Sequence, residues 1–240
     1  MRVLVIAPHP DDEILGCGGT MAKRSKKGDE VYVCIITKGY EPNYTKKEIE
    51  KTRKEDKIAN DILGTKKIYY LDVPTMNFEN VNKGKLSNDI KSIIDEVKPE
   101  EVYIPFHEDI HEEHKIISSC SLVALRPKYN NCKRIYEYET LSETGWDFTT
   151  QEKQFIPNTF ENIDKTLKAK IKALKKIKSQ IEKYPNTRSV ENIEYQARYR
   201  GAILGKEKIE AFILVREIKE WNNDIYSTSA KFFALFGSVL

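Results

Sequence analysis

Long apolar runs are missing from this 240-residue sequence, and no stretch approaches the roughly 18 apolar residues that a membrane-spanning helix needs. The first apolar run, Val3–Ala7, is too short for the apolar part of a signal peptide, and no small-residue cleavage site follows it. Cysteine is scarce too, and no C-x-x-C pair occurs among the four: Cys17, Cys34, Cys120 and Cys132. We therefore expect a cytoplasmic protein with reduced, mostly packed thiols and no integral membrane segment.

A surplus of charge of one sign is also lacking. The 40 Lys and Arg residues nearly balance the 37 Asp and Glu residues, and the formal net charge is +3. Proteins dedicated to nucleic acids usually carry a stronger basic bias, so we expect no nucleic-acid partner. No internal repeat or low-complexity linker divides the sequence, and its length suits one domain covering residues 1–240.

The first half of the sequence alternates short apolar runs with helical patterns. Helices are expected over Gly19–Lys27, from Thr45 with a capping-box spacing to Glu48 as far as Leu63, and after Ser87 as far as Pro99. The runs between them are rich in β-branched or aromatic residues and predict strands: Val3–Ala7, Val31–Ile36, Ile68–Leu71 and Val102–Pro105. This order predicts an α/β fold, a Rossmann-like and mainly parallel sheet flanked by helices.

The second half is less regular. Ile135–Tyr138 and Ile209–Val215 are expected to be strands, and the apolar stripe in Asn162–Tyr184 predicts one long helix. Its many lysines allow an anionic partner, but a solvated helix face is the favoured interpretation. The apolar tail KFFALFGSVL is expected to pack on the body or on a neighbouring subunit.

Histidine is rare, and all four histidines fall in two acidic segments. These are PHPDDE (Pro8–Glu13), directly after the first expected strand, and HEDIHEEH (His107–His114), directly after the fourth. The carboxyl ends of parallel strands share one edge of a sheet, and ligand sites form where the strand order reverses. Because the first strand commonly lies at that reversal beside the fourth, we expect the two segments to meet.

Such a meeting would assemble the ligands of a catalytic metal site. His9 and Asp12 lie three residues apart, and His114 would complete a set of two imidazoles and one carboxylate with a position left for water. Asp11 would take a proton from that water. His111, three residues before His114 on a helical turn, would stabilise an oxyanion as an imidazolium.

Less specific interpretations remain for several of these residues. Either segment alone is also compatible with a surface turn or a polar helix start. His107 is expected in a structural or substrate-edge role, and Asp109 is either an acceptor for His111 or His114 or a surface carboxylate. The glycines beside Cys17 are expected to permit close packing, because the sequence does not meet the G-x-G-x-x-G phosphate-binding pattern.

The segment PHPDDEILGCGGT resembles the opening motif of the PIG-L/LmbE-type zinc-dependent de-N-acetylases. The His-x-x-His pair His111–His114 resembles the second motif of that family. Two late segments resemble its C-terminal signature: YPNTRSVENIEYQARYRG (Tyr184–Gly201) and IEAFILVRE (Ile209–Glu217). The resemblance spans about residues 2–217.

The resemblance implies a Rossmann-like sheet with one zinc ion per chain at the strand ends. It implies that His9, Asp12 and His114 bind the metal, that Asp11 is the general base and that His111 supports the intermediate. Iron, cobalt or manganese would also suit these ligands, because such ligation selects weakly among metals. Members of the family tend to assemble, so a homo-oligomer is expected.

The sequence departs from the family pattern at two places. Glu112 and Glu113 stand where members often carry Pro-Asp, which keeps a carboxylate but lengthens it. The Arg-x-x-Glu element that helps to hold substrate is displaced, and Arg53 is assigned either to substrate contact or to the solvated helix surface.

These observations predict a zinc-dependent hydrolase that removes an N-acetyl group from an N-acetylated amino sugar or sugar conjugate of the N-acetylglucosamine type. The products would be the free amine and acetate. An amidase acting on a non-sugar or thiol-conjugate amide would use the same site. A two-metal phosphoesterase and a non-catalytic sugar-binding module are less favoured. The four histidines in two motifs barely supply one metal site and a helper, and a binding module has no need of Asp11.

Overall fold

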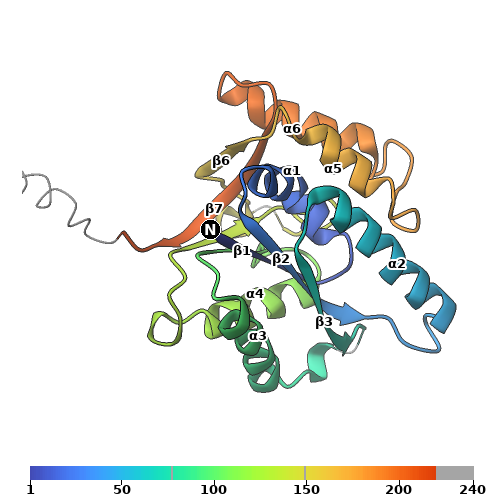
Figure 1. Ribbon diagram of the computed structural model, residues 1–240. Helices are drawn as coiled ribbons and strands as arrows, with labels where there is room; N and C mark the ends of the chain where they lie inside the picture. The colour runs from blue at the N-terminus through green and yellow to red at the C-terminus, as the bar shows by residue number, and fades with distance from the viewer. Residues whose placement is uncertain (77, 149, 220–240) are drawn as a thin grey trace, which may run out of the picture.

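The computed structural model describes residues 1–76, 78–148 and 150–219. Within these ranges a seven-stranded sheet has the order β3-β2-β1-β4-β5-β7-β6 (Figure 1). The strands are β1 (Arg2–Ala7), β2 (Glu30–Lys38), β3 (Lys67–Pro74), β4 (Glu101–Pro105), β5 (Arg134–Tyr138), β6 (Thr159–Asn162) and β7 (Ile209–Glu217). The first five strands of the order are parallel, whereas β7 runs antiparallel to both β5 and β6. The predicted α/β class and mainly parallel sheet are confirmed.

Helices cover both faces of the sheet (Figure 1). They are α1 (Asp12–Lys26), α2 (Lys46–Leu63), α3 (Lys83–Val97), α4 (Glu112–Ala124), α5 (Leu167–Leu174) and α6 (Val190–Ile203). Successive side chains of a strand point to opposite faces. Val3 and Val5 of β1 accordingly pack with α1, α2 and α5, whereas Leu4 and Ile6 pack with α3 and α4. Each of these fully buried side chains contributes about 1.5–3 kcal/mol of transfer free energy.

Local signals account for the bounds of α2. The Thr45 side chain accepts the Glu48 N–H, and the Glu48 carboxylate accepts the Thr45 N–H, so the expected capping box is present. Gly64 ends the helix with φ 79°, a left-handed conformation that glycine adopts without steric cost. The expected starts of α1 and α3 were both too late, since α1 begins at Asp12 and α3 at Lys83.

The glycines of α1 allow close packing, as expected. A Cβ atom at Gly16 would lie 2.2 Å from the Tyr138 ring, and one at Gly19 would lie 2.9 Å from Ile163. Tyr138 in turn donates a hydrogen bond to the Ile6 carbonyl. Helix α1 therefore lies directly against the sheet. Its first residues, from Asp12, lie near the carboxyl end of β1, which ends at Ala7.

The single long helix expected over Asn162–Tyr184 was wrong. Asn162 ends β6, the helix α5 covers only Leu167–Leu174, and the chain then continues through i→i+3 turns. Those turns keep Ile177 buried, so the apolar stripe is satisfied without a continuous helix. They also redirect the chain, which brings residues 180–188 back toward β1.

Several other expectations can be compared with the structure. The four cysteines are unpaired and buried, as expected. No helix in the described ranges is long and apolar enough to cross a membrane. The apolar tail at residues 231–240 lies outside the described residues.

Candidate metal centre and active site

The two histidine segments meet where the strand order reverses. Strand β1 pairs with β2 on one side and β4 on the other, so the residues that follow β1 and β4 share one edge of the sheet. The ring centroids of His9 and His114 lie 5.4 Å apart, and His111 lies 4.9 Å from His9 and 5.6 Å from His114. The predicted meeting of the segments is confirmed.

His111 was expected on the same helical turn as His114, but it precedes helix α4. His111 is its N-cap, and the His111 Nδ1 accepts the Glu113 N–H at 3.3 Å. His114 lies inside the first turn of α4 and is fully buried. His111 thus precedes the helix, and its Nδ1 is occupied by a backbone donor.

One ligand atom each from His9, Asp12 and His114 lies within 4.8 Å of the others. His114 Nε2 is 3.2 Å from Asp12 Oδ2, yet this buried nitrogen has no hydrogen-bond partner, and neither does Asp12 Oδ1. Unpaired buried polar atoms are rare and call for a partner. Two imidazoles and one carboxylate that converge in this way fit a divalent metal ion.

A second carboxylate orients His114. The Asp109 Oδ2 lies 2.8 Å from His114 Nδ1, and Thr144 donates to the other oxygen of Asp109. A hydrogen bond of this kind fixes the tautomer of the imidazole and leaves Nε2 free as a ligand. Of the two interpretations of Asp109, the acceptor for His114 is the one present.

The electrostatics of the site reflect its concentrated carboxylates. Burial lowers the pKa of His9, but hydrogen bonds to Asp12 and Glu113 outweigh it and raise the pKa to about 9. Burial likewise lowers the pKa of His114, while Asp12 and Asp109 raise it to about 10. Burial also raises the pKa of Asp12, but the two imidazoles bring it well below its usual range. The site thus stabilises positive charge at its centre.

Asp11 lies beside the three candidate ligands. Its Oδ2 is buried without a hydrogen-bond partner, and Arg188 Nη1 is 3.5 Å away from that oxygen. Burial and the Asp12 carboxylate raise the pKa of Asp11 to about 7, against the opposing charge of Arg188. A carboxyl group with this pKa can accept and release a proton near neutral pH.

Burial and the neighbouring His9 lower the pKa of His111, which favours its neutral form. Its Nδ1 accepts the Glu113 N–H, which places the ring proton on Nε2. These contacts favour a neutral imidazole that can donate a hydrogen bond, rather than the expected imidazolium.

Sequence reasoning noted Glu113 as the lengthened carboxylate of the second motif but assigned it no partner. This carboxylate is buried, and its Oε1 accepts both the Thr75 hydroxyl at 2.7 Å and the Met76 N–H at 2.8 Å. Glu113 Oε2 also lies 2.7 Å from His9 Nε2, so Glu113 holds the His9 ring. The only available signal was its position in the His-x-x-His motif, one residue before His114.

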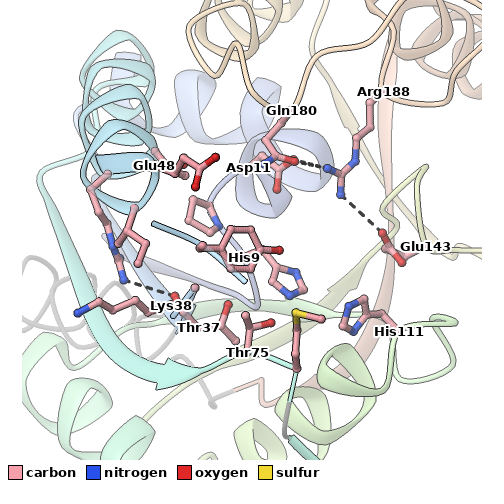
Figure 2. A pocket seen from close by; sticks show the side chains of 17 residues that line it. His9, Asp11, Thr37, Lys38, Glu48, Thr75, His111, Glu143, Gln180 and Arg188 are labelled. Atoms are coloured by element: carbon pink, nitrogen blue, oxygen red, sulfur yellow. Dashed lines mark hydrogen bonds and ion pairs between the residues drawn. The ribbon is translucent and has the colours of Figure 1, made fainter. Parts of the chain in front are cut away.

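Sequence reasoning also gave no role to Arg188 or Gln180. Both come from the segment between α5 and α6, and Arg188 contacts Gln180, Asp11 and Glu143 (Figure 2). Arg188 lies within the segment Tyr184–Gly201 that carries the family resemblance, which was the available signal.

A cavity of about 370 Å³ opens beside these groups. Thr37 and Lys38 lie at one side, and His111, Glu143 and Arg188 lie at the other (Figure 2). Arg53 belongs to the wall: its Nη2 is 2.5 Å from Asp72 Oδ1, and its guanidinium lies 3.8 Å from the centre of the Tyr70 ring. Arg53 is thus part of the cavity rather than of the solvated helix surface.

His107 does not line this cavity. Its Nδ1 lies 2.9 Å from both oxygens of the buried Glu137, and about half of its side chain is exposed. His107 is therefore the one histidine that stands apart from the other three.

The fold and the site define an α/β protein with a candidate metal centre at the carboxyl edge of a mainly parallel sheet. The sequence pattern of the PIG-L family, described as GlcNAc-PI de-N-acetylase, matches residues 4–125, just over half of the chain. The chain belongs to this family.

Curated relatives include deacetylases. The uncharacterized deacetylase YaiS of Escherichia coli is 29% identical over 187 residues, covering 74% of this chain and 90% of YaiS. The diacetylchitobiose deacetylase of Thermococcus kodakarensis is 26% identical over 193 residues, covering 75% of this chain and 70% of that enzyme.

Solved structures share the fold at lower identity. The conserved protein TT1542 of Thermus thermophilus superposes with a TM-score of 0.73 at 24% identity, over 92% of this chain and 97% of that one. GalB, a 4-carboxy-2-hydroxymuconate hydratase of Pseudomonas, gives 0.72 at 17% identity, over 92% and 98% of the two chains. The same fold thus carries different reactions, and the reaction must be argued from the site.

Proposed function

We propose that the protein is a zinc-dependent deacetylase, carried by one domain over residues 1–240, that hydrolyses the N-acetyl group of an amino sugar or sugar conjugate. The products are the free amine and acetate. One observation carries this proposal: a buried Asp11 carboxylate, whose Oδ2 has no hydrogen-bond partner, lies next to the His9, Asp12 and His114 group at the edge of the cavity. Membership of the PIG-L family and the relatives named as deacetylases support it.

His9, Asp12 and His114 would hold the metal, one ion per chain. A divalent ion bound there supplies Lewis acidity, which polarises a carbonyl and makes a water molecule more acidic. Asp109 and Glu113 keep the two imidazoles in ligating orientation. Zinc suits this ligand set, and iron, cobalt or manganese would be accepted by it.

Asp11 is the proposed base and then the acid. It takes a proton from the attacking water as the new C–O bond forms at the acetyl carbon. It then returns a proton to the nitrogen as the C–N bond breaks, so the amine leaves neutral. A pKa near 7 suits a group that does both within one turnover.

His111 is proposed to donate its Nε2–H to the carbonyl oxygen, where negative charge develops during the attack. Arg53 is proposed to contact the substrate from the wall of the cavity. The many polar groups around the cavity suit a hydroxyl-rich sugar better than an apolar amide.

The first experiment is metal analysis of protein purified without chelators, combined with amine release from N-acetylglucosamine conjugates and from non-sugar N-acetyl amides. About one zinc per chain, with amine release that chelation abolishes and zinc restores, is expected. The Asp11→Ala variant should lose turnover and keep the metal, whereas His114→Ala should lose the metal. His107→Ala is the matched control and should keep both.

Amine release from the non-sugar amides alone would mean that the substrate is not a sugar, while the assignment of the site residues would stand. A wild-type protein that contains no metal would contradict the proposal at its root.

A further inference from the structure

The backbone of Asp11 adopts a conformation that side chains rarely allow. Its φ is 135° and its ψ is −26°, in a region that non-glycine residues avoid for steric reasons. Such a conformation persists only when the surroundings hold it. The side chain of Asp11 forms no hydrogen bond that caps α1, so the restraint must come from elsewhere.

Glu13 supplies a contact that restrains this backbone. Its Oε2 accepts the Asp11 N–H at 3.2 Å, and the Glu13 side chain is completely buried. Its Oε1 accepts a hydrogen bond from Asn60 of α2 at 2.8 Å. A charged residue in the first turn of α1 is thus turned inward toward α2 instead of outward to solvent.

Further contacts extend from Glu13 to the opposite wall of the cavity. The same Asn60 amide donates to Asp56 Oδ1 at 2.9 Å, and the Tyr70 hydroxyl donates to Asp56 Oδ2 at 2.7 Å. The Tyr70 ring packs against the guanidinium of Arg53 at 3.8 Å. A continuous set of contacts therefore joins Asp11 to Arg53 behind the cavity that both residues line.

Glu13 and Asp56 share hydrogen-bond donors behind the cavity. The Asn60 amide donates to both carboxyl groups, and the Tyr70 hydroxyl donates to Asp56. The pair can therefore stay buried as a rigid support.

We propose that Glu13 is a positioning residue for Asp11. It holds the Asp11 backbone at its strained φ and couples it, through Asn60, Asp56 and Tyr70, to the wall that carries Arg53. This inference rests on the proposed function, in which Asp11 is the base.

The test compares Glu13→Ala, Glu13→Gln and Lys170→Met. The Gln variant keeps the length of the side chain and a carbonyl oxygen that can accept the Asp11 N–H. The Lys170→Met variant is the matched structural control. Lys170 is buried, donates to the Leu15 carbonyl of α1 at 2.6 Å and pairs with Glu210, without touching Asp11. For each variant, kcat, KM, metal content, thermal stability and a crystal structure are measured.

We expect Glu13→Ala to lower kcat by about 100-fold with one metal per chain and a nearly unchanged KM, since misplacement by about 1 Å costs this much. Its crystal structure should show Asp11 at a different φ. Glu13→Gln should recover most of kcat, and Lys170→Met should lose stability while keeping kcat.

Three results would overturn the inference: an unchanged kcat in Glu13→Ala, a folded Glu13→Gln with a kcat as low as an inactive Asp11 variant, or a retained Asp11 φ in Glu13→Ala. Failure of the proposed function is a separate result, namely a wild-type protein that binds metal and releases no amine from any acetylated substrate. The crystallographic comparison of Asp11 still decides the inference in that case.

Discussion

Arg188 Nη1 lies 3.5 Å from Asp11 Oδ2, although the two residues lie far apart in the sequence. Asp11 follows β1, and Arg188 follows α5 in the segment that turns back toward the sheet. The guanidinium is mostly buried by its neighbours and also contacts Glu143. It therefore acts on the proposed base as a positive charge that solvent screens only weakly.

Removal of this charge should shift the pH dependence of turnover. A positive neighbour favours the carboxylate, so Arg188 lowers the pKa of Asp11, and Arg188→Met should raise it. The acid limb of kcat/KM should then move to higher pH, while Arg188→Lys should move it less. Rate profiles of the three proteins, loaded with the same metal, test this. An acid limb that moves to lower pH in Arg188→Met would contradict the assignment of Asp11 as the base.

Asp109 should control metal affinity without touching the metal. Because it accepts from His114 Nδ1, Asp109→Ala should weaken metal binding by about 10–100-fold. Competition with a chromophoric chelator measures the change. His107→Ala removes a histidine that pairs with Glu137 away from the cavity, and its metal affinity should equal that of the wild type.

Metal binding should release protons. In the metal-free protein the pKa of His9 is about 9 and that of His114 is about 10, so both imidazoles are protonated at pH 7. A metal ligand must be neutral imidazole, so the apparent affinity should rise with pH up to the region of these pKa values. Calorimetric titration in buffers of different ionisation enthalpy counts the protons, and about two per metal are expected. A count near zero would mean that the histidines are not the ligands.

Close packing at α1 should make Gly16 sensitive to substitution. A Cβ atom there would lie 2.2 Å from the Tyr138 ring, so Gly16→Ala should lower the free energy of unfolding by about 1–3 kcal/mol. Gly84 in the first turn of α3 is the control, because its Cβ would meet no atom closer than 3.4 Å. Gly84→Ala should be neutral or stabilising by about 0.4–1 kcal/mol. Denaturant unfolding of the two variants measures both effects.

Much of the fold could be predicted from local sequence features. The runs rich in β-branched or aromatic residues that became β1, β2, β3 and β4, and the capping box and terminal glycine of α2, depend on residues close together in the sequence. The structure of segment 162–184 could not be predicted in this way, because its apolar periodicity suits one long helix as well as a short helix followed by turns. Packing of Ile177 against the body decides between them.

The candidate site, too, could be predicted only in part from the sequence. His9, Asp12 and His114 could be predicted as a group, because their types and the strand ends before them are visible in the sequence. The partners of these residues could not be assigned: Asp109 had two interpretations, and Glu113 was noted as a carboxylate of the second motif without a partner. Glu113 is adjacent to His114 in the sequence, but its carboxylate lies 2.7 Å from Nε2 of His9.

The sequence by itself determined the alternation of strands and helices, the two histidine segments and the chemistry that they supply. These features depend on residue types and on spacings of a few residues, which the sequence shows directly. Only the tertiary structure decided that Arg188 lies beside Asp11, that Glu113 holds His9 and that Glu13 faces Asn60. Such contacts depend on the order of strands in the sheet and on which partners the buried charges meet. A buried charge without a partner destabilises the fold by more than a local conformational preference stabilises it.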